Sequence, residues 1–160
     1  MNLYSITLAT HNIMRWVVVI LAVYALVRVY LGLFGKKDFT ETDRKALSFF
    51  SIGMDIQLLL GLLLYFVLSP VTKAAFGNFG AAMRDSGLRY FAVEHISIMI
   101  IAVILAHVAV IMTKRAPESA AKFRRAAIWL TLSVLALLFA IPWMSRPLLP
   151  MMGALLQFFA

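Results

Sequence analysis

Apart from Arg28 and Arg89, which lie near the ends of their stretches, six ionisable side chains lie inside apolar stretches of this chain, where a charge needs a chemical reason. A charged side chain at the centre of a bilayer costs at least about 2.5–3.5 kcal/mol on insertion scales. Such residues are therefore typical of ion pairs, cofactor ligands and proton-exchange groups. The six are His11, Arg15, Asp55, Glu94, His95 and His107.

His11 and His95 carry the most specific chemistry of this set. They lie in different apolar stretches, and we expect both in the outer half of the membrane. Two histidines on different helices at similar depth can supply both axial nitrogens to a haem iron. Arg15 follows His11 by four residues and shares its helical face, where it can bind a haem propionate or balance charge. The sequence thus predicts a haem b site with His11 and His95 as metal ligands and Arg15 beside them. Histidines that only form packing hydrogen bonds are the alternative.

The other ionisable residues have simpler interpretations. An ion pair between Arg15 and Glu94 would spare both charges from being unpaired in hydrocarbon. We expect a packing or interfacial role for His107, because no further histidine is present to complete a second bis-histidine site. For Asp55 we expect a hydrogen bond between helices, with a role in proton or quinone chemistry as the alternative.

Four apolar stretches position these residues. Of the 160 residues, 63% are hydrophobic and 14% charged, and the mean hydropathy is +0.93. Soluble domains have about 45–50% apolar and about 25% charged residues, so this composition is typical of a membrane protein. The stretches cover residues 3–34, 46–69, 88–113 and 126–143, and each can cross about 30 Å of hydrocarbon as a helix. We therefore predict an all-α, integral membrane four-helix bundle over residues 1–146.

The positive charges predict the orientation of this bundle. The formal charge of +8 comes from basic residues that gather in the loops, so a membrane explains it better than nucleic acid does. Residues 35–45 and 114–125 together hold nine Lys and Arg, whereas the loops on the other side hold four. The positive-inside rule then places both basic loops in the cytoplasm and both termini on the non-cytoplasmic side.

Both ends of the chain also carry information. The first residues lack a basic segment and a small-residue cleavage pattern, so we expect the first helix to be retained. The tail, 147–160, has no charge and is too short to span a membrane. We expect it to lie along the outer interface or against another membrane subunit. The absence of cysteine excludes disulfides, thiolate metal sites, iron–sulfur clusters and covalently attached c-type haem.

Four short segments of the chain together form a recognisable pattern. They are His11, Arg15 and Trp16; Gln57 to Gly61 with Tyr65 and Phe66; Arg89 and Tyr90 with Glu94 and His95; and Ile141, Pro142 and Trp143. In these segments the chain resembles the small four-helix bacterial membrane proteins that are labelled cytochrome B. The resemblance covers nearly the whole chain up to Arg146, and it departs from the family at Asp55, where the family often has a histidine two residues before the glutamine. If that histidine binds the family's haem, the site is lost here; if the ligands match His11 and His95, it is kept.

The residues and the resemblance together favour a multi-pass protein of the bacterial inner membrane. The leading hypothesis is a b-type electron-transfer protein or redox-complex subunit that passes electrons between membrane quinol and a partner, with haem b and quinone as cofactors. The alternative is a non-catalytic accessory subunit of a larger respiratory or photosynthetic complex. A transporter is less favoured, because the sequence has no inverted repeat or broken helix.

Overall fold

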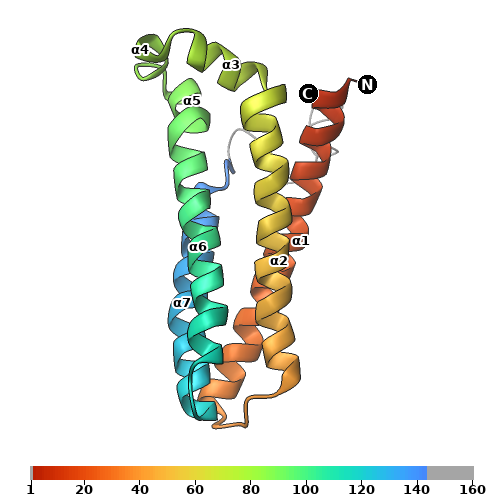
Figure 1. Ribbon diagram of the computed structural model, residues 1–160, viewed down its shortest axis with the longest axis vertical. Coiled ribbons are helices and arrows are strands. Elements are labelled where there is room, and N and C mark those ends of the chain that lie inside the picture. The colour runs from red at the N-terminus through yellow and green to blue at the C-terminus, as the bar shows by residue number, and fades with distance from the viewer. Residues whose placement is uncertain (1, 144–160) are drawn as a thin grey trace, which may run out of the picture.

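The computed structural model describes residues 2–143, and all regular structure within that range is helical. Four long helices lie side by side (Figure 1). Two five-residue π-helical segments, η1 (Leu64–Leu68) and η2 (Tyr90–Glu94), extend the second and third of them. The prediction of an all-α fold with four long apolar helices is confirmed for this part of the chain. The long helices are α1 (Leu3–Phe34), α2 (Glu41–Leu63), α6 (His95–Lys114) and α7 (Ser119–Ala140).

Two of the helical spans begin before the residues that hydropathy marks. The spans Glu41–Leu68 and Ser119–Ala140 both start before the apolar stretches predicted at 46–69 and 126–143. Each starts with polar or basic turns that continue the helix, whereas hydropathy registers only the apolar part. All four spans, including Leu3–Phe34 and Ser86–Lys114, are long and apolar enough to cross a membrane.

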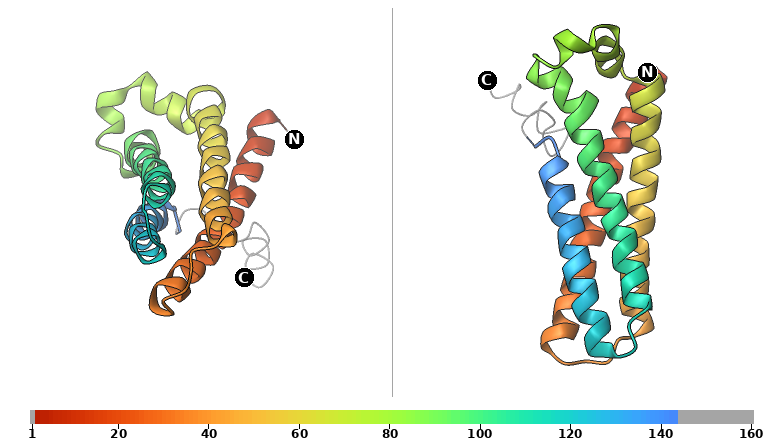
Figure 2. Two further views of the ribbon diagram at one scale, coloured as in Figure 1. Left: turned by 60° about the horizontal axis from the view of Figure 1, so that its bottom comes forward. Right: turned by 60° about the vertical axis from the view of Figure 1, so that its left-hand side comes forward.

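The connections between the long helices gather at two ends of the molecule. The turns after α1 and after α6 lie at one end, shown at the bottom of Figure 1. At the other end, near the start of α1, three short helices lead from α2 to α6 (Figure 2). These are α3 (Pro70–Gly77), α4 (Phe79–Ala82) and α5 (Ser86–Arg89).

Small residues line the contacts between the long helices. The main packing pairs are α6 with α7, α1 with α2, α2 with α6, and α1 with α7. Buried alanines let these helices approach closely, as is common between membrane helices. At Gly32 of α1, an added Cβ would lie 2.1 Å from Cζ of Phe123 in α7. The buried alanines include Ala22, Ala25, Ala102, Ala106, Ala109, Ala126 and Ala127.

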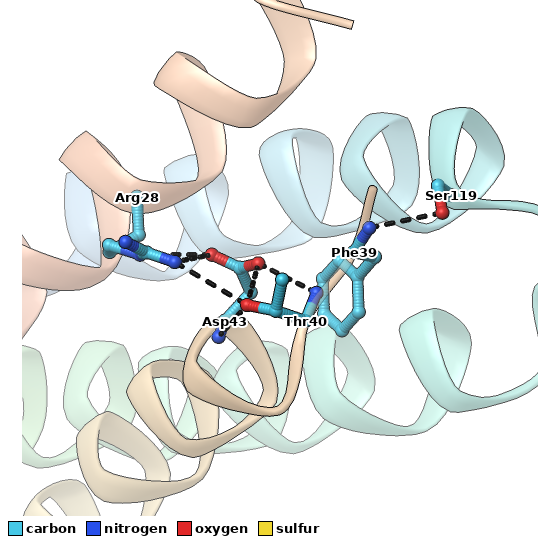
Figure 3. A network of polar contacts seen from close by, with 5 residues as sticks. All are labelled: Arg28, Phe39, Thr40, Asp43 and Ser119. Carbon is cyan, nitrogen blue, oxygen red and sulfur yellow. Dashed lines mark hydrogen bonds and ion pairs between the residues drawn. The ribbon is translucent and has the colours of Figure 1, made fainter. Parts of the chain in front are cut away.

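A polar network closes the end opposite the short helices (Figure 3). Asp43, only 2% exposed, accepts hydrogen bonds from Nε of Arg28 at 2.9 Å and from the backbone N–H of Thr40 at 2.8 Å. The Thr40 side chain accepts from the Asp43 N–H, which completes a capping box at the start of α2. The backbone N–H of Phe39 donates to Oγ of Ser119 at 3.0 Å, so this network joins α1, α2 and α7.

Candidate functional site

The three predicted site residues line one cavity near the end that carries the short helices. Its volume is about 110 Å³, and its walls are largely apolar. His11 and Arg15 reach it from α1, Gln57 from α2 and His95 from α6. The helix α1 packs mainly on α2 and α7. Its side chains therefore approach His95 of α6 across this cavity. The fold thus brings His11, Arg15 and His95 together.

His95 is held by a hydrogen bond from its ring. Nδ1 of His95 lies 2.8 Å from the backbone carbonyl oxygen of Ala140, the last residue of α7. A carbonyl oxygen only accepts hydrogen bonds, so Nδ1 carries the proton and the lone pair lies on Nε2. Metal-binding histidines are commonly oriented by such a bond from the second ring nitrogen. His95 therefore has the tautomer that a ligand role through Nε2 requires.

The end of α7 explains why the Ala140 carbonyl is available. The last carbonyls of a helix have no partners within that helix, and Pro142 has no N–H to offer to Leu138 four residues earlier. Trp143 replaces that donor, because its Nε1 donates to the Leu138 oxygen at 2.9 Å. The Ala140 oxygen accepts from the hydroxyl of Tyr90 at 2.6 Å as well as from His95. The Ile-Pro-Trp segment thus ends α7 at Ala140. The carbonyl of that residue can then bind His95 of α6 and Tyr90 of η2.

His11 is positioned by a glutamine on the neighbouring helix. Nε2 of Gln57 lies 3.1 Å from the His11 carbonyl oxygen and 3.2 Å from Nε2 of the His11 ring. The bond to the carbonyl identifies this Gln57 atom as the amide nitrogen, so His11 accepts through Nε2. The ring also packs on Gly61, where an added Cβ would lie 3.3 Å from Cε1 of His11. Gln57 and Gly61 of α2 therefore fix the imidazole of His11.

Arg15 lies in the wall of the cavity and is 7% exposed. Its guanidinium carbon is 5.5 Å from the centre of the Trp16 ring, within the range of cation–π contacts. The expected ion pair with Glu94 is not formed. Glu94 instead accepts from Nε of Arg89 at 2.7 Å. Arg89 and Glu94 are five residues apart across the π-helical segment η2, and a π-helix brings residues at this spacing together.

Two π-helical segments border the cavity. Leu64 and Tyr65 of η1 and Phe91 of η2 contribute to its walls. The Tyr65 hydroxyl donates to the Ala92 carbonyl at 2.7 Å and joins the two segments. π-Helical turns occur frequently at functional sites, where the extra residue turns side chains toward a new face. The sequence analysis did not identify Tyr65 or Gln57 as site residues, and no sequence signal marks a π-helical turn.

Asp55 and His107 lie outside this cavity and contact each other. Nε2 of His107 is 2.8 Å from Oδ1 of Asp55, and Nδ1 is 3.2 Å from Oγ of Ser51. The hydrogen bond between helices that we expected for Asp55 is therefore present, and it joins α2 to α6.

Comparisons with known proteins add no assignment. No family model, curated protein or solved structure matches this chain. Within residues 2–143, no three His, Asp or Glu side chains form a group that could hold a metal ion. A metal at the cavity would have the two imidazoles of His11 and His95 as its protein ligands, which is the donor set of a bis-histidine haem.

Proposed function

We propose that this chain is a b-type membrane electron-transfer protein, with a redox cofactor bound between α1 and α6. The helices form a bundle that crosses the bacterial inner membrane four times, with both termini on the non-cytoplasmic side. One observation carries the proposal: His11, Arg15 and His95 come from two helices with little mutual packing and line the same cavity. Haem b fits this donor set, because two imidazoles can ligate its iron and it needs no cysteine for covalent attachment.

Each site residue has a separate task in this proposal. His95 would hold the iron through Nε2, since the Ala140 carbonyl orients its ring by Nδ1. His11 would also hold it through Nε2, the nitrogen that contacts the Gln57 amide in this structure, so Gln57 would have to release it. Arg15 would place a positive charge beside the cofactor and balance a propionate. Bound haem would supply one-electron transfer.

The size of the cavity favours quinone as a second ligand of the same site. Its volume of about 110 Å³ is below the roughly 300–1,000 Å³ of typical ligand pockets. A porphyrin is larger than this volume, so haem binding would require the cavity to widen. A quinone ring is smaller, and its carbonyl oxygens accept hydrogen bonds from donors such as the Gln57 amide and the Arg15 guanidinium.

The absorption spectrum of the purified protein tests the haem proposal. Expressed with haem available, the wild type should show a low-spin b-type spectrum, because both axial ligands are imidazoles. His11→Ala and His95→Ala should each abolish or convert that spectrum. Arg15→Leu should shift the midpoint potential or loosen the cofactor without removing it.

His107→Ala is the matched control, because His107 lies outside the cavity and should leave the spectrum intact. A folded but colourless wild type would overturn the haem proposal. Chromatography of lipid extracts from the same preparation then tests quinone. Quinone that co-purifies with the wild type and is lost in Gln57→Leu would identify the cavity as a quinone site. Absence of both cofactors would favour the accessory-subunit alternative.

A further inference from the structure

The Asp55–His107 pair lies on the outside of the molecule, over the contact between α2 and α6. The Asp55 side chain is 40% exposed and that of His107 is 48% exposed, although they are 2.8 Å apart. Ser51, the other partner of His107, is only 4% exposed. The pair therefore bridges the two helices and still presents polar atoms to whatever surrounds this face.

The surroundings of this face are apolar. Asp55 lies near the middle of the span Glu41–Leu68, and His107 lies about two turns before the end of α6. Next to the pair, Ile52 of α2 and Ile104 of α6 are exposed. Lipid chains cannot hydrogen-bond, so ionisable side chains within a membrane face protein or water rather than lipid. The exposed neighbours Ile52 and Ile104 are apolar and do not suit a water-filled cavity, so we expect a protein surface to cover this pair when the helices span a membrane.

We propose that a second copy of this chain covers the pair, in a two-fold symmetric dimer formed by α2 and α6. Two copies in one membrane share the same orientation, so an axis along the membrane normal places their pairs at the same depth. The rotation sets α2 of each copy against α6 of the other, and the carboxylate of Asp55 then faces the imidazole of the second His107. A different partner would need its own matching polar group at this depth. The proposal depends on the membrane placement and is independent of any redox cofactor.

Cysteine cross-linking in native membranes tests this dimer, because the chain has no cysteine of its own. Ile52→Cys and Ile104→Cys place single thiols three residues before Asp55 and His107, on the same helical faces. Because α2 of one copy lies against α6 of the other, the two thiols of either dimer lie diagonally across the interface. A flexible bis-maleimide should link them and convert both variants to a species of twice the mass of the 17.9 kDa chain. Ile20→Cys on α1, also exposed at 66%, is the matched control and should stay monomeric.

Three results would overturn the proposal. These are no dimer from either Ile52→Cys or Ile104→Cys, an equal yield from Ile20→Cys, or cross-links only to a protein of different mass. The role of the pair is tested in the Ile104→Cys background. Asp55→Leu should lower the dimer yield at least several-fold, and the exchange of Asp55→His with His107→Asp should restore it. Unchanged yield in Asp55→Leu, with the protein still in the membrane fraction, would exclude the pair from the interface.

Discussion

At the scale of single residues, polar side chains in this molecule are held by partners on other helices. Gln57 engages His11, and the Ala140 carbonyl engages His95. At the opposite end, the buried carboxylate of Asp43 binds Arg28 and the backbone of Thr40 (Figure 3). The ion pair of Arg28 with Asp43 thus joins α1 to the start of α2.

Replacement of Asp43 should therefore weaken the fold. Asp43→Ala removes the acidic member of the capping box and the carboxylate that Arg28 contacts. Loss of a helix cap alone costs about 0.5–2 kcal/mol, and we expect a decrease in unfolding free energy of at least about 1 kcal/mol. Denaturant titration of the protein in detergent, followed by circular dichroism, measures this change.

Asp38→Ala is the control for that measurement. Asp38 is an exposed carboxylate in the same turn, and its contact with Oγ of Ser119 is long, at 3.5 Å. Its replacement should change the unfolding free energy by less than about 0.5 kcal/mol. Equal effects of the two substitutions would contradict a specific role for Asp43.

At the scale of helices, close packing depends on residues without bulky side chains. Gly32 lets α1 approach the ring of Phe123, which is 1% exposed. Gly32→Ala would force its Cβ into that ring, and overpacking of this kind typically costs about 1–3 kcal/mol. We expect a lower thermal stability for Gly32→Ala and partial recovery when Phe123→Leu is added.

Gly77→Ala gives the comparison at this scale. An added Cβ at Gly77 meets no atom within 4 Å. The substitution should leave the melting temperature unchanged or slightly raised, because alanine favours helix over glycine. If Gly32→Ala melts at the same temperature as the wild type, α1 and α7 are not packed as described.

The helices themselves were largely predictable from the sequence, whereas their mutual contacts were not. Long apolar stretches must form helices to satisfy their backbone in a membrane, so four spans could be found from hydropathy. The positions of His11 and His95 within those spans also predicted that the two side chains lie at similar depth in the membrane. The contact of His11 with Gln57 depends on the rotation of α1 against α2, which hydropathy does not encode. Nor does hydropathy mark the π-helical segment η2, which brings Glu94 to Arg89, five residues earlier, in place of Arg15.

At the scale of the whole molecule, one end holds the cavity and the short helices, and the other holds the basic turns. The positive-inside rule places the basic turns in the cytoplasm. A reporter active only in the cytoplasm should therefore work when inserted at residue 40, and one active only outside should work when fused after residue 160. Cytoplasmic activity of the C-terminal fusion would contradict this orientation.

The apolar tail, residues 147–160, lies outside the described residues, and its predicted role can be tested by deletion. Removal of residues 147–160 should leave the four helices inserted while reducing the recovery of any subunits that co-purify. The yield of inserted protein is the control for folding. Unchanged recovery of the other subunits would show that the tail does not bind them.

The Ala140 carbonyl at the end of α7 connects the position of the His95 ring to the chain that follows this helix. Ala140 accepts from both Tyr90 and His95, and Trp143 closes the same helix end by its bond to Leu138. A protein that binds the chain just after Trp143 would displace the end of α7, which orients the His95 ring. Displacement of that helix end would move the Ala140 carbonyl, and with it the His95 ring that donates to this oxygen.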